Sequence, residues 1–113
     1  MIKIYHNPRC TKSREALALL TSEGKEFETI KYLENPLSEK ELKEILKLLN
    51  IPAIDLVRKN ELIWKESYKN KKLSEAQIIS ALIKNPKLIE RPIVINGNKA
   101  AFGRPLDTIR SIL

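Results

Sequence analysis

The chain has 113 residues, the length of one domain, and no apolar run approaches the roughly 20 residues needed to cross a bilayer. Its 21 Lys and Arg against 14 Asp and Glu give a formal net charge of +7, which suits nucleic acid, an acidic protein surface or an oxyanion. The few aromatic residues are not interleaved with arginine as a base-stacking platform requires, so nucleic-acid binding is disfavoured. One cysteine cannot form an internal disulfide, and a strand-like segment without a signal-peptide pattern opens the chain, so we expect a cytoplasmic protein.

The first third of the chain predicts a strand, a helix and a second strand. Met1–Tyr5 is short, β-branched and aromatic, as strands are. From Ser13 onward apolar residues recur at helical spacing, and Gly24 follows where a helix C-terminus favours glycine. Glu26–Tyr32 alternates polar and apolar residues. Such a βαβ unit predicts that the two strands run parallel.

The middle of the chain predicts helices. Ser38-x-x-Glu41 and Ser74-x-x-Gln77 are capping boxes, and each precedes an apolar stripe at helical spacing. Ala53–Val57 predicts a short helix that leads to Arg58. Residues 59–72 are charged and weakly patterned, and we assign no element to them.

The last third predicts a hairpin and a helix. Ile93–Ile95 and Ala100–Phe102 flank Asn96-Gly97-Asn98, a strong hairpin pattern. Pro105 suits the first turn of a final helix, where its missing N–H costs nothing. We therefore expect a single α/β domain over residues 1–113, with a four-stranded mixed sheet and a helical insertion at about 33–90 between a βαβ part and a ββα part.

The candidate for chemistry is Cys10, between the first predicted strand and helix. Unpaired N–H groups and the positive dipole end at a helix N-terminus favour a thiolate and can cradle an oxyanion. Arg9, Lys12 and Arg14 add positive charge to this segment, and Pro8 fixes its approach. The alternative is an inert, buried cysteine, which is the commoner kind. A polar, basic loop favours the reactive thiol.

The segment Tyr5-His6-Asn7-Pro8-x-Cys10-x-x-Ser13-Arg14 resembles the active-site segment of the glutaredoxin-coupled arsenate reductases, the ArsC family. That family belongs to a larger ArsC/Spx group with a modified thioredoxin fold. Further matches follow in the same order along nearly the whole chain, at Leu56-Val57-Arg58-Lys59-Asn60, Glu90-Arg91-Pro92-Ile93-Val94 and Gly103-Arg104-Pro105. The resemblance implies that the predicted sheet is thioredoxin-like.

The resemblance also implies roles for individual residues. Arg58, Arg91 and Arg104 would bind the oxyanion and stabilise the transition state, a task that suits the planar, permanently charged guanidinium. Pro92 would follow a cis peptide bond. His6 would orient the loop and tune the thiolate, and Ser13 would donate a hydrogen bond to the Cys10 sulfur. Thr11-Lys12 departs from the Gly-Thr pair of well-studied arsenate reductases, which affects the anion cradle.

The implied function is a cytoplasmic arsenate reductase with arsenate as substrate, glutathione as co-substrate and glutaredoxin as partner. No bound cofactor, metal or membrane contact is expected. Two alternatives stay open: an Spx-like transcription regulator that binds the RNA polymerase α subunit, and a glutathione-linked thiol oxidoreductase with another substrate. The regulators typically sense disulfide stress through C-x-x-C, whereas Ser13 stands at the second position here.

Overall fold

The computed structural model describes residues 2–102 and 106–113. By its internal contacts the chain divides into two compact units, one made of Met1–Asn35 with Arg91–Leu113 and the other of Pro36–Glu90. The expected insertion at about 33–90 therefore corresponds to the second unit. That residues 1–113 act as one domain stays a prediction.

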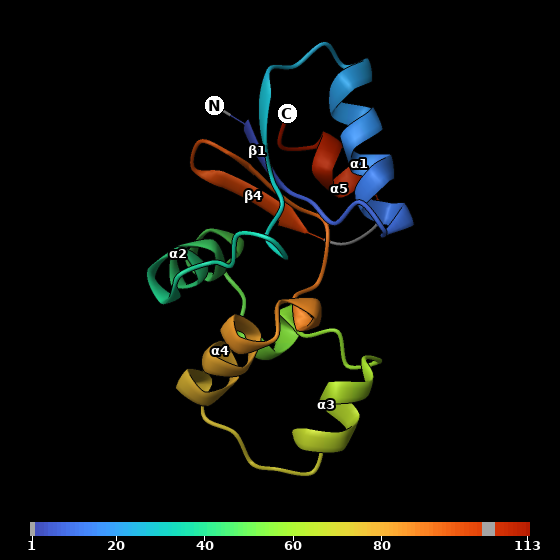
Figure 1. The fold of residues 1–113 in the computed structure, drawn as a ribbon. Helices are drawn as coiled ribbons and strands as arrows, with labels where there is room; N and C mark the ends of the chain where they lie inside the picture. The colour runs from blue at the N-terminus through green and yellow to red at the C-terminus, as the bar shows by residue number, and fades with distance from the viewer. Residues whose placement is uncertain (1, 103–105) are drawn as a thin grey trace. The chain divides into compact units, whose positions relative to one another are not determined.

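The first unit is built on a four-stranded mixed sheet, which confirms the predicted class of fold (Figure 1). Its strands are β1 (Ile2–Tyr5), β2 (Phe27–Ile30), β3 (Ile93–Asn96) and β4 (Lys99–Phe102), in the order β2-β1-β3-β4. β2 runs parallel to β1 as the βαβ pattern predicts, and β3 runs antiparallel to both β1 and β4. β1 is thus a central strand with neighbours from both ends of the chain.

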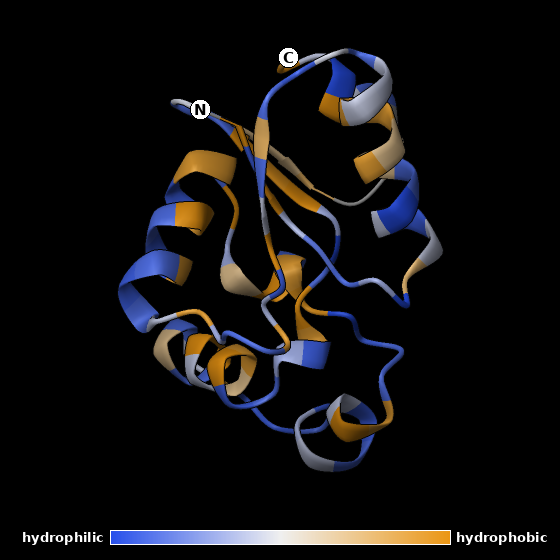
Figure 2. Ribbon diagram, turned by 45° about the horizontal axis from the view of Figure 1, so that its top comes forward, coloured by the Kyte–Doolittle hydropathy of each residue, from blue (hydrophilic) through white to orange (hydrophobic). Residues whose placement is uncertain are grey.

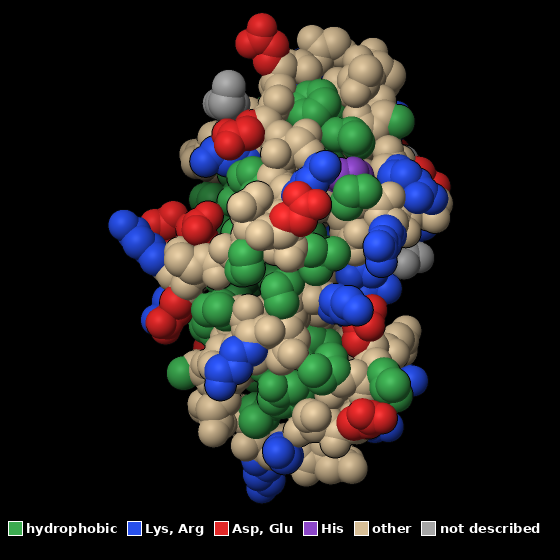
Figure 3. Space-filling view, in the orientation of Figure 1, with side chains coloured by type: hydrophobic (Ala, Val, Ile, Leu, Met, Phe, Trp, Pro, Cys, Tyr) green, Lys and Arg blue, Asp and Glu red, His purple; other side chains and the backbone are tan. Residues whose placement is uncertain are grey.

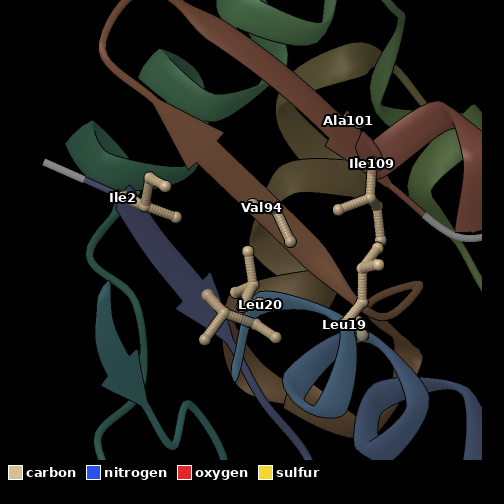
Figure 4. Close-up of a cluster of buried hydrophobic side chains, with 8 residues drawn as sticks. Ile2, Leu19, Leu20, Val94, Ala101 and Ile109 are labelled. Carbon is tan, nitrogen blue, oxygen red and sulfur yellow. The ribbon is translucent and has the colours of Figure 1, made fainter. Parts of the chain in front are cut away.

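Helices α1 (Thr11–Ser22) and α5 (Leu106–Arg110) pack against each other in this unit (Figure 1). Alternate strand residues and the inner faces of the helices bury one apolar cluster, drawn in Figure 4 and made of Ile2, Ile4, Ala16, Leu19, Leu20, Val94, Ala101 and Ile109. Burying an aliphatic side chain contributes about 1.5–3 kcal/mol, so this cluster fixes α1 on the sheet. It thereby fixes the position of the N-terminus of α1.

Two glycines shape the turns of the first unit. Gly24 has φ 67°, and the N–H groups of Gly24 and Lys25 donate to the carbonyls of Thr21 and Leu20, the Schellman pattern that ends α1. Gly97 has φ 63° at the first central position of the β3–β4 turn, where a type II′ turn requires glycine. Both predicted boundaries are confirmed.

The second unit is helical, with α2 (Glu39–Leu49), α3 (Leu62–Ser67), α4 (Glu75–Lys84) and the 3₁₀ helices η1 (Ala53–Leu56) and η2 (Pro86–Leu88). Both predicted capping boxes form, at Ser38 with Glu41 and at Ser74 with Gln77. The orange residues along the helices in Figure 2 include the buried apolar stripes of α2 and α4. The Glu75 carboxylate accepts from the Ala53 N–H at 2.9 Å and so joins α4 to the start of η1.

One helix of the second unit was not predicted. α3 lies in the charged 59–72 segment, where Trp64 is 6 % exposed and stacks on Tyr68 with ring centroids 5.6 Å apart. Six residues are too few to show a helical stripe, and the stabilising contact is aromatic packing. No helix in the described part of the chain is both long enough and apolar enough to cross a membrane.

Candidate active site around Cys10

The strand register gathers three segments at one end of the sheet. Tyr5, the last residue of β1, pairs with Ile30 of β2 on one side and with Ile93 of β3 on the other. The segment that leaves β1, the segment that leaves β2 and the segment that enters β3 therefore meet at this end. The N–H of His6 extends the ladder by donating to the Ile30 carbonyl at 2.8 Å.

A tight turn carries the chain from β1 into α1. The Cys10 N–H donates to the Asn7 carbonyl at 3.0 Å, and the Arg9 N–H donates to the Asn7 side-chain oxygen at 3.0 Å. Pro8 occupies the second position of this turn, which its fixed φ favours. Cys10 is the N-cap of α1, and its carbonyl accepts the first helical hydrogen bond, from the Arg14 N–H. This confirms the predicted place of Cys10 at the helix start.

The Cys10 sulfur lies in a hydrogen-bonding cradle. Partial burial acts to raise the pKa of the thiol, but hydrogen bonds from the Arg91 side chain and from the backbone N–H groups of Ser13 and Lys12 outweigh it, and the charge of Arg91 adds to them. The pKa of Cys10 therefore lies below its ordinary value. The two N–H groups are orphan donors of the first turn of α1, so the helix N-terminus acts on the sulfur directly.

Ser13 contributes to this cradle through its backbone, while its hydroxyl belongs to a buried network. The hydroxyl oxygen is 2.6 Å from His6 Nδ1 and accepts from the Asn7 N–H at 3.0 Å. Burial and the charges of Lys31 and Arg14 hold the pKa of His6 below its usual range, against an opposing hydrogen bond from Ser13. These effects favour the neutral imidazole. Only a small part of this single histidine reaches the surface, purple in Figure 3.

The side-chain charge that lowers the pKa of Cys10 is that of Arg91. Lys12 and Arg14, which we expected to add positive charge beside the sulfur, have other partners. The Arg14 guanidinium donates to the Pro8 carbonyl at 3.0 Å and to the Thr11 hydroxyl at 3.3 Å. The Lys12 ammonium pairs with Glu15 at 3.4 Å. These contacts turn both side chains to the loop and to the exposed helix surface.

Arg91 and Pro92 stand just before β3. The Arg91–Pro92 peptide bond is cis, which confirms that prediction, and Pro92 is buried. Burial acts to lower the pKa of Arg91, but its interactions with Cys10 and with Tyr32 raise it above the ordinary value. Arg91 is therefore a permanent cation that interacts with the Cys10 sulfur, and its role in anion binding stays a prediction.

For the other two predicted arginines, Arg58 and Arg104, no interaction with Cys10 is described. Arg58 belongs to the second unit, where its Nε lies 3.5 Å from the Glu61 carboxylate and its Nη1 lies 3.7 Å from that of Glu90. Its N–H donates to the Leu88 carbonyl at 2.7 Å. Arg104 lies outside the described residues. The roles of Arg58 and Arg104 in anion binding stay predictions.

One residue of the site escaped the sequence analysis. Tyr32 follows β2, is 1 % exposed, and interacts with Arg91 so as to raise the pKa of the guanidinium. No motif in the sequence marks Tyr32 as a site residue. The parallel pairing of β1 with β2 brings residues 31–32 to the end of the sheet where Cys10 lies. Within the described residues no three His, Cys, Asp or Glu side chains gather into a group that could hold a metal ion.

The alkylation of Cys10 by iodoacetamide should have a pH midpoint below the free-thiol value of about 8.5. Only the thiolate reacts, so the rate should rise with pH through the lowered pKa and level off before a free cysteine does. Unfolded protein in denaturant, which contains the same single thiol, is the control. If the pH midpoint of alkylation in the folded protein equals or exceeds that in the unfolded protein, the hydrogen bonds to the Cys10 sulfur do not stabilise the thiolate.

Comparisons with known proteins identify the family of the chain. The ArsC family matches residues 5–112. An arsenate reductase of Haemophilus influenzae is 46 % identical over 97 % of both chains, and the uncharacterized protein YfgD of Escherichia coli is 46 % identical over 99 % of this chain and 96 % of its own. The structure of an arsenate reductase from Vibrio cholerae superposes with a TM-score of 0.94 at 41 % identity, covering 99 % of this chain and 97 % of that one. The chain therefore belongs to the ArsC family.

Proposed function

We propose that this protein is an arsenate reductase that uses glutathione and glutaredoxin, and that it works in the reducing cytoplasm. The observation that carries the proposal is the Cys10 sulfur held between two N–H groups of α1 and the Arg91 guanidinium. A lowered thiol pKa supplies the nucleophile at neutral pH. The same donors can hold the oxygens of a tetrahedral anion. Relatives named arsenate reductase, at 43–46 % identity over nearly the whole chain, support arsenate as that anion.

The first step is attack of the Cys10 thiolate on arsenic. A sulfur–arsenic bond forms and one arsenate oxygen leaves as hydroxide or, once protonated, as water. Negative charge gathers on the remaining oxygens, and preorganised donors there lower the barrier. Arg91 supplies such donors beside the sulfur, together with the backbone N–H groups of Lys12 and Ser13. Arg58 and Arg104 have the same task by resemblance.

Glutathione completes the reduction. Its thiolate attacks the Cys10 sulfur, the sulfur–arsenic bond breaks, and its electron pair stays on arsenic, which leaves as arsenite. Arsenic is reduced from the +5 to the +3 state while two thiols become one mixed disulfide. The chain has no second cysteine, so an external thiol has to break this disulfide. Glutaredoxin does so by thiol–disulfide exchange.

The mixed disulfide is the product that tests this sequence of steps. After incubation with arsenate and glutathione, mass spectrometry should find one added glutathione, confined to the peptide that contains Cys10. Added glutaredoxin should remove it and restore turnover, with arsenite as the product. Incubation without arsenate is the matched control, since arsenate is the oxidant.

Two outcomes would contradict the proposal. An adduct that forms equally well without arsenate would mean that arsenate does not oxidise Cys10. Tight binding of the RNA polymerase α subunit by the Cys10→Ser variant, together with the absence of arsenite formation by the unaltered chain, would favour the regulator instead.

A further inference from the structure

Arg91 can act on the sulfur only if its long side chain is held in place. Four rotatable bonds separate a guanidinium from the backbone, and fixing such a side chain costs up to about 2 kcal/mol of conformational entropy. Arg91 is only partly buried, so packing alone does not fix it. A second interaction partner of the guanidinium, besides Cys10, adds a constraint on its position.

Tyr32 stands where such a partner is needed. It lies two residues beyond Ile30, which pairs with Tyr5, and Arg91 lies two residues before Ile93, which pairs with the same Tyr5 from the other side. The two side chains therefore come from opposite flanks of β1 to the end of the sheet at which Cys10 lies. The Tyr32 side chain is 1 % exposed, and its interaction with the guanidinium acts to raise the pKa of Arg91.

We propose that Tyr32 is a positioning residue for Arg91, which its hydroxyl holds against the Cys10 sulfur. In this arrangement Tyr32 acts on the thiolate through the guanidinium. Its removal should therefore weaken the stabilisation of the thiolate while leaving the N–H cradle of α1 intact. The inference concerns the thiolate and holds whether or not arsenate is the substrate.

The test is the Tyr32→Phe variant, which removes one oxygen and keeps the ring. The midpoint of Cys10 alkylation against pH should rise by about 0.5 unit, which is about threefold less thiolate at a pH below the midpoint. The matched control is Tyr68→Phe, whose lost hydroxyl accepts from the Asn85 side chain at 3.3 Å in the second unit. Thermal unfolding of both variants separates a change of the site from a change of stability. The control should leave the alkylation midpoint unchanged.

A double-mutant cycle decides whether Tyr32 acts through Arg91. In an Arg91→Ala background, Tyr32→Phe should leave the alkylation midpoint where Arg91→Ala alone has put it. An equal rise in both backgrounds would overturn the inference, because Tyr32 would then act on the sulfur by another route. An unchanged midpoint in Tyr32→Phe alone would overturn it as well.

A measurement on the unaltered chain tests the contact without any substitution. Nuclear Overhauser effects should join the ring protons of Tyr32 to the guanidinium protons of Arg91, and a folded protein that lacks them would contradict the contact. Neither measurement uses arsenate. An active arsenate reductase could thus fail this test, and a protein that passes it could still reduce another substrate, so the two proposals stand or fall separately.

Discussion

Replacement of Cys10 by serine should reduce arsenate turnover by about four orders of magnitude, or to the detection limit, which is the size of loss expected when a catalytic nucleophile is removed. The hydroxyl is not ionised near neutral pH, and neither two N–H groups nor Arg91 can lower its pKa far enough to change that. The mixed disulfide with glutathione should be absent too, since no other thiol exists in the chain. Arsenite formation and mass spectrometry measure the two losses.

The same variant should fold at least as well as the original chain. Cys10 is the N-cap of α1, a position at which serine is preferred because its oxygen accepts from the N–H groups of the first turn. The unfolding temperature should therefore be equal or higher, which separates loss of the nucleophile from loss of structure. Residual turnover at a tenth of the original rate would rule out Cys10 as the nucleophile.

The fold was predictable where local chemistry and periodicity point the same way. Both capping boxes and the Asn-Gly hairpin use side chains or backbone conformations within four residues, so the sequence contains the whole interaction. α3 was not predictable in this way. Trp64 and Tyr68 stabilise it by stacking and burial, which depend on what surrounds the segment rather than on its own pattern.

In the site, the place of Cys10 was predictable but the source of its positive charge was not. A helix start after a strand is visible in the sequence, and its N–H groups follow from the backbone alone. Nearness in sequence says little about where a long side chain points, and so Lys12 and Arg14 were assigned a charge effect that Arg91 has. The family resemblance supplied Arg91, 81 positions away along the chain.

In the buried polar network, too, the residues were predictable but their hydrogen bonds were not. His6 and Ser13 were predicted to support the cysteine, yet the sequence did not indicate that the Ser13 hydroxyl lies 2.6 Å from His6 Nδ1 while its backbone N–H binds the sulfur. Tyr32 had no motif around it and was one of several aromatic residues. Its interaction with Arg91 depends on the register that brings β2 and β3 to either side of β1.

Arg91→Lys should lower kcat/KM for arsenate about a hundredfold, although it keeps the charge. Loss of one preorganised donor to a developing anion commonly costs about 3 kcal/mol, which is a factor of a hundred or more in rate. A lysine ammonium is a compact point charge that cannot give the two parallel N–H contacts of a guanidinium. It also loses the hydrogen bond that Arg91 makes to the Cys10 sulfur, so the alkylation midpoint should rise at the same time.

Arg14→Lys is the matched control for this substitution. Arg14 lies four residues from Cys10 and is exposed, and its guanidinium contacts the Pro8 carbonyl and the Thr11 hydroxyl instead of the sulfur. The same chemical change there should leave kcat/KM within about twofold, since surface substitutions rarely change much. Steady-state assays with glutathione and glutaredoxin in excess compare the two variants. Full activity of Arg91→Lys would show that charge alone suffices beside Cys10, and the anion would then have to be held by the N–H groups of α1 and by arginines other than Arg91.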